Sequence, residues 1–70
     1  MAKKVAEHHR KAAEHHEHAA RHHKEAAKHH ETGKHETAAH HAHLARGHEE
    51  RANKLSEEAV EEYIILFPTL

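Results

Sequence analysis

The sequence predicts an all-α protein, an antiparallel helical hairpin that dimerises into a four-helix bundle. Three observations support this prediction: a seven-residue repeat over residues 5–32, a break at Thr32 and Gly33, and a second alanine-rich stretch with the same spacing from about residue 38. The 70 residues suffice for one small domain, 1–70. Because single cores of this size are rarely stable unaided, we expect a partner or another stabilising element.

The first predicted helix covers about residues 3–32. In register, its repeats read VAEHHRK, AAEHHEH, AARHHKE and AAKHHET. A helix turns about 100° per residue, so the alanines and the paired histidines share a face about 160° wide. The opposite face is almost wholly Glu, Lys and Arg, which we interpret as a solvated surface. The pattern indicates an amphipathic helix whose inward face consists of alanine and imidazole.

A turn at residues 32–34 is expected next, because Gly33 readily takes the left-handed conformation that ends a helix. The second predicted helix covers about residues 35–63. A loop this short joins antiparallel neighbours, which gives the hairpin. Four alanines keep the seven-residue spacing in this half: Ala38, Ala45, Ala52 and Ala59.

The last part of the chain is different, because residues 64–70 form an apolar tail. Ser56 is a possible cap of a short separate helix, and the alternative is that the second helix simply continues. Pro68 stops any helix there. We expect the tail to pack against a partner chain or to cap one end of the bundle, since a segment this apolar is poorly placed in water. The tail and the preceding segment hold seven of the nine Val, Ile, Leu and Phe residues: Leu55, Val60, Ile64, Ile65, Leu66, Phe67 and Leu70.

A hairpin that turns near Gly33 pairs residues whose numbers sum to about 64–67, with one layer of imidazoles every 10.5 Å or so. The expected cross-helix pairs are His23 with His41, His16 with His48, and His8 and His9 with Glu57 and Glu58.

Fourteen histidines in helical register predict binding of divalent transition-metal ions: copper, zinc, nickel or cobalt. Rings three or four residues apart on one helix, or on facing helices, can converge on one ion. Sites built from histidine should rank copper above zinc and nickel. The predicted ligands are His15, His16, His18, His22, His23, His40, His41, His43 and His48.

Buffering or sequestration of these ions is the predicted function. The alternative is a structural or pH-responsive interaction protein whose histidines form hydrogen-bonded layers without metal. The chain has 11 basic and 12 acidic residues, and its net charge of −1 would rise to +13 if every histidine were protonated. Histidine titrates between about pH 5 and 8, so acid would change this charge strongly.

Other classes of function find little support. There is no fixed basic patch and almost no aromatic residue, so we expect no nucleic-acid partner. No catalytic motif is complete, and we expect no enzyme activity. No apolar run is long enough for a membrane span. The first residues have no apolar stretch behind their lysines, so we expect a cytoplasmic protein.

The run AAEHHEHAARHHKEAAKHHETGKHETAAHHAHLARGH, residues 12–48, resembles a family of small histidine-rich bacterial proteins of uncharacterised function. They share the alternation of AA and HH, the glycine break and the AAHHAH start of the second half. The resemblance implies a bacterial origin and no established activity. The acidic and then apolar residues 49–70 depart from the pattern, because histidines often continue toward the end in such proteins.

Overall fold

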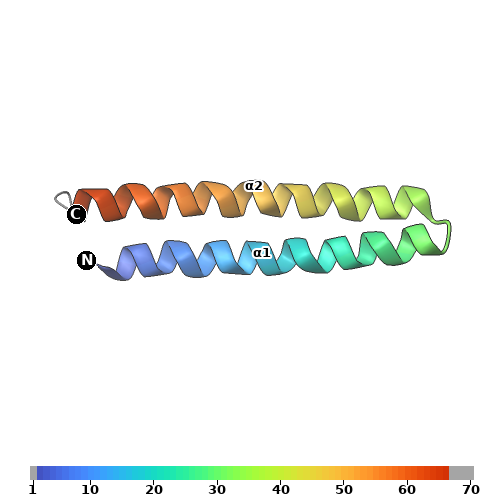
Figure 1. Cartoon of the computed structure of the whole chain (residues 1–70), viewed down its shortest axis with the longest axis horizontal. Helices are drawn as coiled ribbons and strands as arrows, with labels where there is room; N and C mark the ends of the chain where they lie inside the picture. Colours follow the sequence, from blue (N-terminus) through green and yellow to red (C-terminus); the bar gives the residue numbers. More distant parts are fainter. Residues whose placement is uncertain (1, 67–70) are drawn as a thin grey trace.

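The computed structural model describes residues 2–66, which form two long antiparallel helices. Helix α1 is Ala2–Glu31 and helix α2 is His35–Leu66. They lie side by side along their whole length, with the start of α1 and the end of α2 at the same end of the rod (Figure 1). The rod measures 54 × 14 × 14 Å. The predicted all-α hairpin is confirmed, and no strand occurs among the described residues.

The turn between the helices is held by backbone hydrogen bonds and one glycine. Gly33 has a φ of 78°, in the left-handed region that favours glycine. The Lys34 N–H donates to the His29 carbonyl at 2.8 Å, and the Gly33 N–H donates to the His30 carbonyl at 3.2 Å. These two bonds form a Schellman motif, which satisfies carbonyls that the end of α1 would otherwise leave unpaired. The turn therefore has a defined geometry that fixes where α2 begins.

Alanines at seven-residue spacing form the contact between the helices, which we call the seam. Their small side chains let the two backbones approach closely. Partly buried histidines, such as His15 and His48, alternate with them along the seam. Leu55 is the one large side chain in the buried core of the described residues. The buried alanines are Ala12, Ala19, Ala26, Ala38, Ala45, Ala52 and Ala59.

Only half of the wide alanine and imidazole face is covered. The second alanine of each repeat is exposed, and so is the second histidine, as at Ala13 and His16. The reason is geometric: a single neighbouring helix covers one narrow stripe, whereas residues 100° apart on α1 point toward different neighbours. A single hairpin therefore covers one stripe of this face, and the expected burial of the whole face in a four-helix bundle stays a prediction.

The second helix does not stop at Ser56, and it continues past residue 63 to Leu66. Its last turns expose several large apolar side chains. The exposed fractions are 55% for Val60, 44% for Tyr63, 58% for Ile64 and 71% for Ile65. The predicted tail residues Phe67, Pro68 and Leu70 lie outside the described residues. Neither described helix has a segment long and apolar enough to cross a membrane.

Candidate metal site between the helices

Five histidine rings form a continuous zigzag between the helices, which we call the imidazole row. It passes from His15 to His48, His22, His41 and His29, alternating between α1 and α2. Successive ring centroids are 5.1, 5.7, 5.3 and 5.5 Å apart. All five side chains are partly buried. The seven-residue spacing on each helix creates this row, because it returns each histidine to the seam.

Two cross-helix pairs within the row bring ring nitrogens together. The Nδ1 atoms of His15 and His48 are 2.9 Å apart, and those of His22 and His41 are 3.0 Å apart. In each pair one ring donates its Nδ1–H to the bare Nδ1 of the other, so the two neutral rings must be opposite tautomers. Two nitrogens bound at right angles to one ion, each at about 2.0–2.1 Å, would be about 2.9 Å apart. Each pair thus has the spacing of two adjacent metal ligands.

A carboxylate joins the row at its end nearer the turn. One ligand atom each from Glu25, His29 and His41 lie within 4.8 Å of one another, and we call this set the Glu25 triad. Glu25 and His29 are one turn apart on α1, with the His29 Nε2 3.6 Å from the Glu25 Oε2, and His41 comes from α2. Neighbouring ligands of a tetrahedral zinc ion are about 3.3 Å apart, so small side-chain movements bring the triad to ligand spacing. Three protein ligands leave a fourth position for water or another donor.

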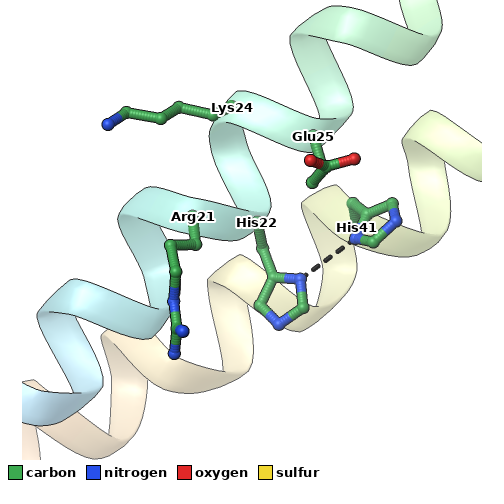
Figure 2. A pocket seen from close by; sticks show the side chains of 5 residues that line it. All are labelled: Arg21, His22, Lys24, Glu25 and His41. Atoms are coloured by element: carbon green, nitrogen blue, oxygen red, sulfur yellow. Dashed lines mark hydrogen bonds between the residues drawn. The ribbon is translucent and has the colours of Figure 1, made fainter.

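An open hollow of about 460 Å³ lies beside the triad. Figure 2 shows His22 and Glu25 directed from α1 toward His41 on α2, while Lys24 extends away from the seam. Arg21 extends from α1 on the left of His22 in this view. Because the hollow is open to solvent, an ion has access to the carboxylate and to His41 without unfolding of the hairpin.

Two rings of the row, His22 and His48, have surroundings that favour the neutral imidazole. Burial lowers the pKa of His22 below its usual value of 6.5, and the neighbouring His41 and Arg21 lower it further. Burial likewise lowers the pKa of His48, with added repulsion from His18 and the other nearby rings. A neutral ring keeps a lone pair for a metal ion, so a lower pKa reduces competition by protons at neutral pH.

A further ring, His18, lies against the row without converging on its paired nitrogens. Its centroid is 5.0 Å from that of His48 and 6.4 Å from that of His15. The Arg21 guanidinium donates a hydrogen bond to the His18 Nδ1. That nitrogen is therefore occupied, and its use as a ligand would require Arg21 to move.

The nine histidines predicted as ligands fall into two groups. Five of them lie in or against the imidazole row: His15, His18, His22, His41 and His48. The other four are exposed: His16, His23, His40 and His43. Among these four, His23 hydrogen-bonds Glu49 instead, and His40 touches only the edge of the His41 ring. The described residues give His16 and His43 no hydrogen-bond or ring partner.

The expected cross-helix register is wrong by one residue. His22, not His23, faces His41, and His15, not His16, faces His48. The expected contact of His8 with Glu58 is present, with 3.2 Å between the His8 Nε2 and a carboxylate oxygen. The error follows from the wide face, since the repeat alone does not say which member of each histidine pair points at α2.

Two members of the Glu25 triad were not among the predicted ligands. His29 continues the seven-residue spacing of His15 and His22, so the repeat itself contained the signal. Glu25 was assigned to the solvated face, although its position four residues before His29 places the two side chains one turn apart.

Comparisons with known protein families, curated proteins and solved structures give no match to this chain. The resemblance to small histidine-rich bacterial proteins stays a prediction. The chemistry of the site therefore rests on the geometry of its own residues.

Proposed function

We propose that this protein binds divalent transition-metal ions reversibly, as a buffer or sequestering protein, with the Glu25 triad as its principal site. The convergence of Glu25, His29 and His41 from two helices carries the proposal. Two imidazoles and a carboxylate suit zinc, cobalt, nickel and copper, and copper should bind most tightly. The other rings of the row add further donors within one or two helical turns.

Calorimetric titration of the full chain with Zn²⁺ and Cu²⁺ at pH 7.5, after exhaustive chelation, tests the proposal. We expect at least one equivalent of each ion to bind. Glu25→Gln removes a charged ligand with little change in shape, and His41→Ala removes the ligand from α2. Each should weaken the tightest zinc site at least tenfold, on the order of what disturbed metal sites lose. His16→Ala is the matched control, because His16 is exposed and outside the row.

Binding of less than one equivalent of both ions would overturn the proposal. Equal zinc affinity in the Glu25→Gln, His41→Ala and His16→Ala variants would show that the triad is not the site. Circular dichroism of each variant without metal separates loss of a ligand from loss of the helices.

The alternative function is a pH-responsive interaction protein, and the two Nδ1–Nδ1 hydrogen bonds favour it. Each bond needs a ring with a bare Nδ1, and protonation of both rings removes that acceptor. This reading requires no metal. It therefore predicts that acid disrupts the histidine pairs and that no metal ion binds in the calorimeter. The absence of metal binding distinguishes it from the first proposal.

Self-association into a homodimeric four-helix bundle belongs to the same proposal. The exposed second alanines of α1 and the exposed Val60, Ile64 and Ile65 support it, since an isolated hairpin leaves them in water. Light scattering of the intact chain should give a mass above that of one chain, and removal of residues 63–70 should lower the mass or the melting temperature. An unchanged mass together with unchanged melting would refute a role of the tail in assembly.

A further inference from the structure

A third histidine pair lies across the turn, outside the imidazole row and the Glu25 triad. His30 is in the last turn of α1, and His35 is the first residue of α2. Their Nδ1 atoms are 2.8 Å apart, their ring centroids are 5.0 Å apart, and the ring planes differ by 37°. Both side chains are exposed. Neither residue was among the predicted metal ligands.

The backbone of the turn holds these two rings in place. The Gly33 N–H donates to the carbonyl of His30, and the Lys34 N–H donates to the carbonyl of His29. The Lys34 carbonyl accepts the first hydrogen bond of α2, from the Ala38 N–H, at 3.0 Å. His35 directly follows Lys34, so both histidines are joined to hydrogen-bonded backbone. The two histidines are only five positions apart in the sequence, and closing so short a loop around an ion costs little further chain entropy.

The separation of the two nitrogens matches a coordination edge. Bonds of about 2.0 Å at right angles place two nitrogens about 2.8 Å apart, as adjacent ligands are in square-planar and tetragonal complexes of Cu²⁺ and Ni²⁺. A tetrahedral zinc ion would need a separation of about 3.3 Å. We propose that His30 and His35 form a second, solvent-exposed metal site, which holds Cu²⁺ or Ni²⁺ through two adjacent imidazole nitrogens and leaves the remaining positions to water or to a ligand from another molecule.

Binding at this site exchanges a hydrogen bond for two metal bonds. In the free protein one Nδ1 carries a hydrogen and the other accepts it. When the ion binds, that hydrogen leaves Nδ1 and a proton is taken up at Nε2 of the same ring, so both Nδ1 atoms present lone pairs. Two neutral rings therefore bind the ion without net release of protons.

The turn site extends the proposed metal binding and depends on the same imidazole chemistry, but it shares no residue with the triad. The triad has a carboxylate and two partly buried rings from both helices. The turn site has two exposed nitrogens and needs only the turn to be intact. We therefore expect it to exchange ions with solvent faster, and to prefer copper or nickel over zinc more strongly than the triad does.

The experiment uses the full-length chain labelled with ¹⁵N in a Glu25→Gln/His41→Ala background, where the triad is disabled. Cu²⁺ is added below one equivalent, and its paramagnetism broadens the amide signals near the bound ion. We expect the signals of residues 32–34 to broaden first. Adding His30→Ala or His35→Ala should abolish this broadening and weaken Cu²⁺ binding at the turn at least tenfold. His16 is an exposed histidine on α1, the helix that also carries His30. Adding His16→Ala should leave the broadening unchanged.

Each outcome decides for or against the turn site. Broadening at residues 32–34 that survives both His30→Ala and His35→Ala overturns the proposal, as does Cu²⁺ that collects only near His15 and His48. If Cu²⁺ does not bind at the turn while the unsubstituted chain still binds zinc through the triad, the turn site alone is wrong. If neither binds, the proposed function fails as well. Circular dichroism without metal confirms that the variants keep their helices.

Discussion

Replacing Leu55 by alanine should be the most damaging single truncation in the seam. Leu55 is 4% exposed and is the one large side chain of a described core that otherwise contains alanine. Leucine-to-alanine changes in cores cost about 2–5 kcal/mol, and the lower part of this range, about 2–3 kcal/mol, fits a two-helix seam that can close around the gap. One kcal/mol lowers the melting temperature of a chain this small by about 4–8 °C. Thermal unfolding followed by circular dichroism should therefore show a drop of about 10–20 °C.

Val60→Ala is the matched control for Leu55→Ala. Val60 lies on the same helix and is 55% exposed in the single hairpin, and alanine is the better helix former, so in an isolated hairpin the change should stay within about 0.5 kcal/mol. If the proposed dimer covers Val60, the loss should be larger. If both substitutions are harmless, the assignment of Leu55 to the core is wrong. If both are equally damaging, Val60 is covered in solution, and the isolated hairpin is refuted in favour of an assembly of chains.

Two further predictions concern acid and the two glycines. The pKa values of His22 and His48 are lowered on folding, so the unfolded chain binds more protons than the folded chain. The contribution of these two histidines to stability is therefore complete above the unfolded pKa of about 6.5. It is lost as the pH falls below about 6.5 toward the lower pKa values of the folded chain. Helical circular dichroism that stays flat from about pH 8 to 4 would contradict this. Gly33→Ala should destabilise the hairpin by about 1 kcal/mol, because the φ of Gly33 is 78°. Gly47→Ala should stabilise it by about 1 kcal/mol, because Gly47 lies within α2 and an added Cβ would meet open space. Unfolding in urea that gives the same sign for both changes would refute the backbone argument.

The hairpin could be predicted from the sequence because local signals determine it. The seven-residue repeat sets the helical period, Gly33 marks the turn, and the short loop leaves only an antiparallel arrangement. The position of the seam could not be predicted to one residue. Ala12 and Ala13 are chemically identical, and so are His15 and His16, so their sequence gives no preference between the two faces. That choice depends on α2, whose alanines and Leu55 form one stripe and accept one stripe of α1.

The candidate metal site could likewise be predicted only in part. The row was predictable in outline, since histidines at seven-residue spacing must return to one side of a helix. Glu25 was not, because a glutamate among lysines and arginines resembles any solvated residue. It reaches the site only because His41, from the other helix, lies beside its own neighbour His29. A ligand set built from two helices depends on their register, which the spacing within one helix does not contain.

If the proposed metal site binds an ion, that ion should stabilise so thin a seam, and this leads to the last prediction. The Glu25 triad takes ligands from both helices, so a bound ion would cross-link α1 to α2. An ion that binds only the folded chain stabilises it by about 2.7 kcal/mol when the free ion concentration is about 100 times the Kd. That gain is close to the expected loss in Leu55→Ala. Zinc at this excess should therefore return the melting temperature of Leu55→Ala to about that of the metal-free, unsubstituted chain. In Leu55→Ala combined with Glu25→Gln and His41→Ala, the same zinc concentration should restore much less. Full recovery in the combined variant would mean that the ion stabilises the hairpin from elsewhere, and the triad would not be the cross-link.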